Sequence, residues 1–247
     1  MGTKFMRKFL CLFVLVAVAF SMVGCAPDAQ KVGGVFGTRL NELPIAKEAD
    51  VIFVVVQDEF TTFCTYYAYT KSWGVWTEEF VTEGYVGRSG VLSDPTNRRA
   101  GDGTTPGGIY SIGERFGIYD RPSGLVGQYT KVTEDDYWNG DSSTDTYNQH
   151  VKGSEMPDTW NPASSEHLID YKESYNYAAM INFNVNPAIP GKGSCIFLHC
   201  TRTGASSSAG CVAIPEEKMI ECLKFMGNKN GYIVILRNAE EFDNYVE

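Results

Sequence analysis

The pattern of hydrophobic and polar positions predicts a chain built mostly of strands. Residues 51–56 (VIFVVV) form an unbroken apolar run, which is typical of a strand buried on both faces. Only residues 215–226 are predicted as a clear helix, because Pro215 opens the segment, two acids follow in its first turn and Gly227 lies just past its end. Further strands are expected at residues 62–69, 75–81, 109–112, 177–185, 194–200 and 232–236.

A long polar and aromatic stretch, residues 116–172, interrupts these strands. It shows no clear hydrophobic period, and a stretch of this length usually has a function or covers another part of the fold. We therefore expect it to form a lid or wall over a cleft. Four polar side chains within it are expected to face solvent: Asp135, Asp136, His150 and His167.

The first residues have the pattern of an export signal. A basic start over residues 1–8 precedes an apolar run over residues 9–20, which is shorter than the ~20 residues of a membrane-spanning helix. The next residues, MVGC, resemble the lipobox of bacterial lipoproteins, in which cleavage precedes a cysteine that is then acylated. We expect a signal peptide over residues 1–24 and lipid on Cys25. A plain signal peptide cut elsewhere is the alternative.

This interpretation sets the domain organisation and the location. Residues 25–37 are small and rich in glycine, so we expect a lipid-anchored tether. Residues 38–247 then form one mostly-β domain, exported and held at the extracytoplasmic face of a membrane by its lipid.

Composition and cysteine content narrow the possible functions. Hydrophobic residues make up 43% and charged residues 21%, which excludes general disorder. The net charge of −9 and the lack of a basic stripe exclude nucleic-acid binding through phosphate neutralisation. Beyond Cys25 the chain keeps an odd number of cysteines, so at least one is unpaired. They are Cys64, Cys195, Cys200, Cys211 and Cys222, and a disulfide among the four other than Cys211 stays open.

One segment carries a candidate catalytic pair. In SCIFLHC, the period of two along a strand places Cys195, Phe197 and His199 on one face. The small and polar residues that follow, TRTGASSSAG, can return a second strand beside the first, beginning at Cys211. His199 and Cys211 then share one surface.

A cysteine and a histidine on one surface suit nucleophilic acyl transfer. The thiolate is the nucleophile and an imidazole accepts its proton, so we expect His199 to hold Cys211 as an activated thiolate. The backbone carbonyl of Cys200 is the nearest group to orient that imidazole. The N–H groups of Ala209, Gly210 and Cys211 lie at a tight turn and are candidate donors to the oxyanion. An inert cysteine beside a core histidine is the alternative, whereas a zinc site is disfavoured because adjacent strand residues point to opposite faces.

The segment FLHC…SAGCVAIP is similar to the His…[Ser/Thr]-x-Gly-Cys signature of the YkuD-type L,D-transpeptidases. Residues 87–90 (GRSG) and 101–108 (GDGTTPGG) resemble two further motifs of that family, and the likeness runs from about residue 51 to residue 236. Shorter matches are Phe116-Gly117, Tyr147-Asn148 and Gly193-Ser194.

The resemblance implies a β-sandwich domain outside the cytoplasm that acts on peptidoglycan stem peptides. Cys211 is then the nucleophile that attacks the bond between an L-centre and a D-centre, with His199 as general base and then acid. Ser208 and Ala213 are expected at the substrate rim. The resemblance implies no metal and no organic cofactor, and we expect a monomer.

Two departures from the family pattern leave the substrate preference and the acceptor open. The loop between His199 and Cys211 is shorter than in many relatives, and Ala213 stands where many carry Arg or Asn. An L,D-carboxypeptidase or endopeptidase of the same fold is one alternative, because water and amines compete for an acyl-enzyme. A non-catalytic peptidoglycan-binding lipoprotein is another, although it has no need of the cysteine and the histidine. A papain-like or NlpC/P60-type peptidase is disfavoured because its nucleophile precedes its histidine.

Overall fold

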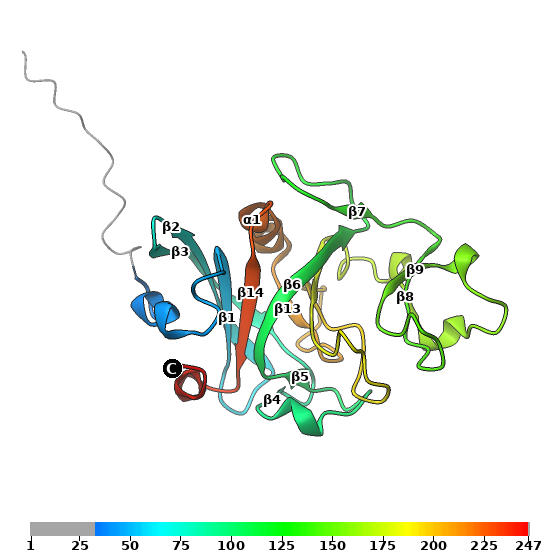
Figure 1. Cartoon of the computed structure of the whole chain (residues 1–247), viewed down its shortest axis with the longest axis horizontal. Helices are drawn as coiled ribbons and strands as arrows, with labels where there is room; N and C mark the ends of the chain where they lie inside the picture. Colours follow the sequence, from blue (N-terminus) through cyan, green and yellow to red (C-terminus); the bar gives the residue numbers. More distant parts are fainter. Residues whose placement is uncertain (1–32, 247) are drawn as a thin grey trace, which may run out of the picture.

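The computed structural model describes residues 33–246, and a nine-stranded sheet forms its centre (Figure 1). The strand order is β11-β12-β13-β3-β2-β1-β14-β6-β7, and a further pairing of β11 with β6 closes the sheet. The strands are β1 (Val51–Gln57), β2 (Phe63–Ser72), β3 (Val75–Tyr85), β6 (Gly108–Gly117), β7 (Thr130–Lys131), β11 (Ala178–Ile181), β12 (Phe197–Cys200), β13 (Val212–Ile214) and β14 (Gly231–Leu236). The predicted mostly-β class with few helices is confirmed, but the main sheet closes like a barrel.

The other elements are short. The single α-helix of the described residues is α1 (Glu216–Met226), as the Pro215 and Gly227 signals predicted. Two small sheets consist of β4 (Val91–Leu92) with β5 (Thr105–Pro106), and of β8 (Asp136–Trp138) with β9 (His150–Lys152) and β10 (Glu166–His167). The 3-10 helices are η1 (Gly37–Glu42), η2 (Pro95–Asn97), η3 (Gly153–Glu155), η4 (Pro162–Ser164), η5 (Leu168–Asp170) and η6 (Ala239–Asn244).

Strand β1 is buried on both faces, as its apolar run predicted. It pairs antiparallel with β2 and parallel with β14. Phe53 and its alternate neighbours face the core cluster that also contains residues of α1, whereas Ile52 and Val54 face a second cluster. Burial on both sides explains why residues 51–56 include no polar side chain, whereas Gln57 stands at the less buried end of the strand.

Phe36 belongs to the second cluster, although the sequence placed it in the tether. Its side chain is buried, and its ring packs against Phe242 with centroids 5.0 Å apart. Phe36 therefore belongs to the folded domain and not to a tether, because its ring packs on an apolar partner from the other end of the chain. The predicted signal peptide and the lipid site Cys25 lie outside the described residues. No helix within residues 33–246 combines the length and the apolar character needed to cross a bilayer.

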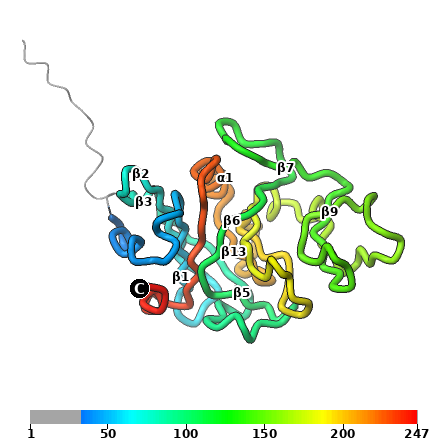
Figure 2. Tube along the Cα trace, in the orientation of Figure 1, coloured from blue at the N-terminus to red at the C-terminus, as the bar shows by residue number. Residues whose placement is uncertain are grey.

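Residues 116–172 contain local structure of their own. The β10-β8-β9 sheet and three 3-10 helices form within or next to this stretch. In Figures 1 and 2 this part of the chain, green to yellow-green, lies to one side of the main sheet. Its sequence lacks a clear period because its strands have only two or three residues each.

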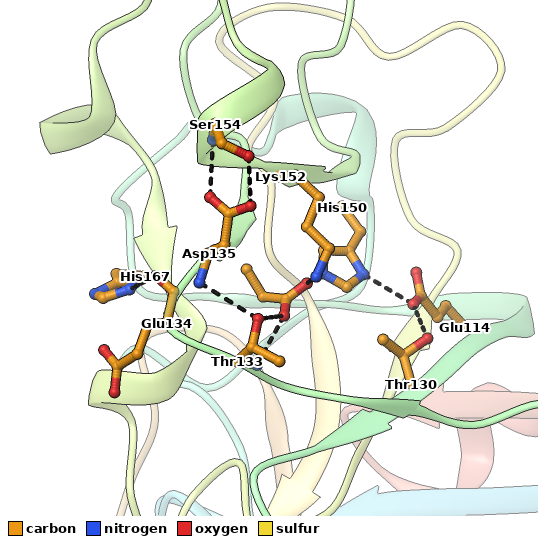
Figure 3. A network of polar contacts seen from close by, with 10 residues as sticks. Glu114, Thr130, Thr133, Glu134, Asp135, His150, Lys152, Ser154 and His167 are labelled. Atoms are coloured by element: carbon orange, nitrogen blue, oxygen red, sulfur yellow. Dashed lines mark hydrogen bonds and ion pairs between the residues drawn. The ribbon is translucent and has the colours of Figure 1, made fainter.

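A buried ionic network attaches the small sheet to β6, which corrects the expectation of solvated side chains (Figure 3). The imidazole of His150 contacts Glu114 of β6 through Nδ1 at 2.8 Å and Asp136 of β8 through Nε2 at 2.7 Å. Carboxylates only accept hydrogen bonds, so both ring nitrogens donate and the ring carries a charge. Lys152 contacts the same Asp136 oxygen at 2.7 Å, and the side chain of Asp136 is fully buried.

The other two residues expected in solvent also form hydrogen bonds with neighbouring turns. His167 lies with its Nδ1 2.9 Å from Asp170 and its Nε2 2.8 Å from the carbonyl oxygen of Glu134. Asp135 accepts hydrogen bonds from the backbone and the hydroxyl of Ser154. Sequence-local patterns give no sign of these contacts, because the partners come from different turns.

We expect Asp136→Asn to lower the free energy of unfolding by about 2 to 3 kcal/mol. Burial by itself raises the pKa of Asp136, but hydrogen bonds from Lys152, Thr133 and His150 outweigh it and lower the pKa to about 2. The stabilisation is thus complete above the ordinary pKa of 3.8 and is lost as the pH falls through about 2. Urea denaturation at several pH values measures it.

Asp135→Asn is the matched control, and we expect it to have a much smaller effect because Asp135 contacts only Ser154 and its own turn. Equal destabilisation by the two variants would contradict the role given to Asp136.

Candidate active site

Cys211 lies where a serine-rich turn meets β13, beside the first residue of β12. The two strands are parallel, with Leu198 opposite Val212 and His199 opposite Ala213. This register puts the side chains of Cys211 and His199 on the same face of the sheet. The Cys211 Sγ atom accepts a hydrogen bond from the Phe197 backbone N–H at 3.3 Å and donates one to the carbonyl oxygen of Cys195 at 3.3 Å.

His199 is oriented by the carbonyl group that the sequence pointed to. Its Nδ1 lies 2.8 Å from the carbonyl oxygen of Cys200. A carbonyl oxygen only accepts, so Nδ1 carries the proton and Nε2 keeps a lone pair. The ring of Tyr175 packs edge-to-face on the imidazole, with centroids 5.5 Å apart. His199 is therefore held in one orientation, and its neutral form has one defined tautomer.

Both side chains line one cavity of about 650 Å³. Cys211 is 6% and His199 5% exposed, so little of either residue is accessible from the cavity. Its walls come from the serine-rich turn, from the loop before β12 and from residues 163–175. The long polar stretch thus contributes part of the wall beside the cysteine and the histidine.

Burial sets the charge state of the pair. Desolvation raises the pKa of the Cys211 thiol to about 12, and the negative charge of Glu166 acts in the same direction. Desolvation lowers the pKa of His199 to about 4. At neutral pH the resting site therefore holds a thiol and a neutral imidazole. Burial thus disfavours the thiolate that was expected at rest, because the sequence does not reveal how deeply both groups are buried.

The three backbone N–H groups that were expected as oxyanion donors differ in their hydrogen bonds. The N–H of Gly210 is already bound to the Ser208 hydroxyl oxygen at 3.0 Å, which corrects its assignment as a donor. The same hydroxyl donates to the carbonyl oxygen of Cys211 at 2.6 Å and closes the turn. The N–H groups of Ala209 and Cys211 have no hydrogen-bond partner within residues 33–246.

The two predicted rim residues differ in position. Ser208 lines the cavity. Ala213 is fully buried and does not line it, because it lies beside His199 in the interior of the sheet. The assignment of Ala213 to the rim is therefore wrong.

The loop before β12 depends on a buried asparagine. Cys195 has a φ of 57°, in the left-handed region, and β12 begins only at Phe197. Cys195 therefore lies outside the strand, which corrects its placement in a strand over residues 194–200. Its N–H donates to the Asn148 side-chain oxygen at 3.1 Å, and the Trp138 indole donates to the same oxygen at 3.0 Å. Asn148 thus links the small sheet to the residue whose carbonyl accepts from Cys211.

Several charged residues that line the cavity were not predicted as site residues from the sequence. Arg98 is 3% exposed and donates to the carbonyl oxygens of Thr104 and Lys192. Arg88, Arg202 and Glu166 also line the cavity. These residues lie in separate loops, so only the fold brings them together. The five cysteines of the described residues are all free thiols, and Cys195 lines the cavity together with Cys211.

A family model of the YkuD L,D-transpeptidase catalytic domain matches residues 50–235, which include the cysteine and the histidine. Among solved structures, the chain is similar to the helical cell shape determining protein Pgp2 from Campylobacter jejuni, with 14% identity and a TM-score of 0.41, over 76% of this chain and 49% of that one.

A second similar structure is Bdellovibrio bacteriovorus Bd1075, with 12% identity and a TM-score of 0.40, over 82% of this chain and 55% of that one. The chain thus spans about half the length of these structures. A search of curated protein sequences finds no match.

The neutral resting pair predicts that Cys211 contributes no thiolate at neutral pH. We expect the ultraviolet thiolate absorbance of the wild type and of Cys211→Ala to coincide below about pH 9, because the pKa of the thiol is raised to about 12. A thiolate step at about pH 6 that disappears in Cys211→Ala and in His199→Ala would show instead an ion pair at rest.

Proposed function

Because the chain belongs to the YkuD family of L,D-transpeptidase catalytic domains, we propose that it is a peptidoglycan L,D-transpeptidase that works through an acyl-enzyme on Cys211. The observation that carries the proposal is the placement of Cys211 and His199 on one face and in one cavity, with Nδ1 of the imidazole bound to a carbonyl oxygen. A volume of about 650 Å³ is enough for a few residues of a stem peptide.

Acylation starts from the neutral pair. As the Cys211 sulfur attacks the carbonyl carbon of the L-centre, its proton passes to Nε2 of His199. The imidazolium that forms is stabilised by its Nδ1–H bond to the Cys200 carbonyl oxygen. Moving the proton only during attack avoids two separated charges in a buried site at rest.

The serine-rich turn stabilises the tetrahedral intermediate. Its oxyanion accepts from the N–H groups of Ala209 and Cys211, which are free for this role. The imidazolium then gives its proton to the leaving amine of the D-residue, and the bond between the L-centre and the D-centre breaks. The thioester on Cys211 remains.

The second half of the reaction returns the enzyme to its starting state. An acceptor amine attacks the thioester carbonyl, one of its protons passes to His199, and the Cys211 sulfur leaves and regains a proton from the imidazolium. Attack by water in place of the amine gives the carboxypeptidase or endopeptidase reaction. The two outcomes share every step up to the thioester.

We also propose that the protein is exported and anchored by lipid on Cys25. The basic start, the short apolar run and the MVGC sequence support this location. Acyl chains on one cysteine give stable membrane residence, since each buried CH₂ contributes about 0.8 kcal/mol.

The full-length protein in detergent, mixed with purified muropeptides and followed by mass spectrometry, tests the function. We expect cross-linked dimers with the wild type and a loss of at least about 100-fold in Cys211→Ala and His199→Ala. Cys222→Ala, another buried cysteine that does not line the cavity, is the control with near wild-type activity. Removal of a terminal D-residue without dimers identifies the carboxypeptidase. Unchanged muropeptides would contradict an enzymatic role.

The anchor has its own test. We expect Cys25→Ser to move the protein from the membrane fraction to the soluble fraction of cells, because no acylated cysteine remains. Cys64→Ser controls for general effects of losing a thiol. Equal membrane retention of Cys25→Ser and the wild type contradicts the lipid anchor.

A further inference from the structure

Glu166 is the one acid among the described residues that line the active-site cavity. It begins β10, opposite Trp138 of β8, and so comes from the wall formed by the long polar stretch. One of its carboxylate oxygens accepts a hydrogen bond from the Tyr175 hydroxyl at 2.5 Å. Tyr175 in turn packs against His199 and Phe197, so the carboxylate is held one residue away from the imidazole.

The carboxylate lacks a cation. No Lys, Arg or His within residues 33–246 forms an ion pair with Glu166, although three arginines line the same cavity. Arg98 is instead engaged by carbonyl oxygens. The reaction steps derived above also make no use of Glu166. Glu166 is half-buried, and its carboxylate has the Tyr175 hydroxyl as a hydrogen-bond donor but no countercharge. An acid in this position of a substrate cavity is suited to a cationic ligand group that supplies the missing charge.

The charge state of Glu166 indicates which kind of ligand group can bind beside it. Burial raises the pKa of Glu166 to about 7, although the Tyr175 hydroxyl lowers it. A positive charge brought to the free oxygen favours the ionised carboxylate and replaces the lost hydration with a charge-assisted hydrogen bond. A compact group with several donors fits this position, because it can donate to the carboxylate and also to the Tyr175 hydroxyl oxygen.

We propose that Glu166 and Tyr175 form a subsite for a primary ammonium group of the peptide substrate. The inference rests on the proposed function, since it takes the cavity to be the substrate site. The ammonium group comes either from the side chain of the donor peptide or from the acceptor. In both cases the carboxylate binds the ammonium group beside the wall of residues 163–175. A donor ammonium stays bound there while the peptide carbonyl lies at Cys211, whereas an acceptor ammonium first passes a proton to Glu166 and then attacks the thioester as a neutral amine.

Binding to the full-length Cys211→Ala protein, which needs no catalysis, tests the subsite. Calorimetry compares a stem tetrapeptide that carries a free side-chain amine with the same peptide acetylated on that amine. We expect the free amine to bind about tenfold more tightly, and Glu166→Gln in the Cys211→Ala background to remove the difference. Tyr175→Phe keeps the ring against His199 and should reduce the preference in part.

Glu173→Gln is the matched control. This acid is close in the sequence and accepts a hydrogen bond from the Thr203 backbone at 2.8 Å, but it does not line the cavity. We expect it to keep the full preference for the free amine. Thermal unfolding of each variant separates a folding defect from a binding defect.

Kinetics with the otherwise wild-type protein identify the source of the ammonium group. If the donor supplies it, acetylation of the donor slows acyl-enzyme formation about tenfold in the wild type and has no effect in Glu166→Gln. If the acceptor supplies it, acylation is unchanged and Glu166→Gln lowers the ratio of transfer to hydrolysis about tenfold.

The outcomes separate this inference from the proposed function. A preference for the free amine that survives in Glu166→Gln, equal binding of both peptides, or no binding of either overturns the subsite. Normal acyl-enzyme formation with no effect of Glu166→Gln overturns the subsite alone. Failure of the wild type to form an acyl-enzyme, together with amine-dependent binding through Glu166, overturns the proposed function and leaves the subsite in place.

Discussion

Desolvation of one thiol and one imidazole is the constraint on which the rest of this site depends. Both groups lie in the sheet interior, and burial makes the charged form of each unfavourable. Burial therefore favours a neutral pair at rest, and in the proposed mechanism the charges separate only during attack. That mechanism assigns two fixed groups to the separated charges: the Cys200 carbonyl oxygen to the imidazolium, and the backbone N–H groups of Ala209 and Cys211 to the oxyanion.

The small β10-β8-β9 sheet makes this burial possible. Trp138 from β8 packs edge-to-face on Phe197, with centroids 4.9 Å apart, and Phe197 is the residue whose N–H binds the Cys211 sulfur. The ionic network around His150 holds the small sheet on β6, and Asn148 connects it to the loop that contains Cys195. Residues 116–172 thus form part of the candidate active site, although none of them forms or breaks a covalent bond in the proposed reaction.

Patterns with a short range were predictable from the sequence. The apolar run of β1 reflects burial on both faces, and the ends of α1 follow from Pro215 and Gly227. The shared face of His199 and Cys211 follows from the period of two, because neighbouring strands in register present paired residues on the same side. The carbonyl partner of His199 was predictable too, since it belongs to the next residue.

Features that depend on distant partners were not predictable. Phe36 packs on Phe242, and Asp136 is paired with Lys152 and His150. Ala213 is buried beside His199 in the sheet. No local pattern in the sequence encodes these contacts. The left-handed backbone of Cys195, whose N–H donates to Asn148, delays the start of the predicted strand from residue 194 to Phe197. Glu166 stood in a polar stretch without any periodic signal, and only the closed fold places it in the cavity of Cys211.

Rapid acid quenching of the full-length protein with a stem tetrapeptide, followed by peptide mapping in a mass spectrometer, shows whether Cys211 forms the proposed thioester. We expect an acyl group on the peptide that contains Cys211 and on no other. We also expect His199→Ala to accumulate far less of this adduct. An acyl group on Cys195, the other cysteine of the cavity, or product formation without any adduct would contradict the proposed thioester on Cys211.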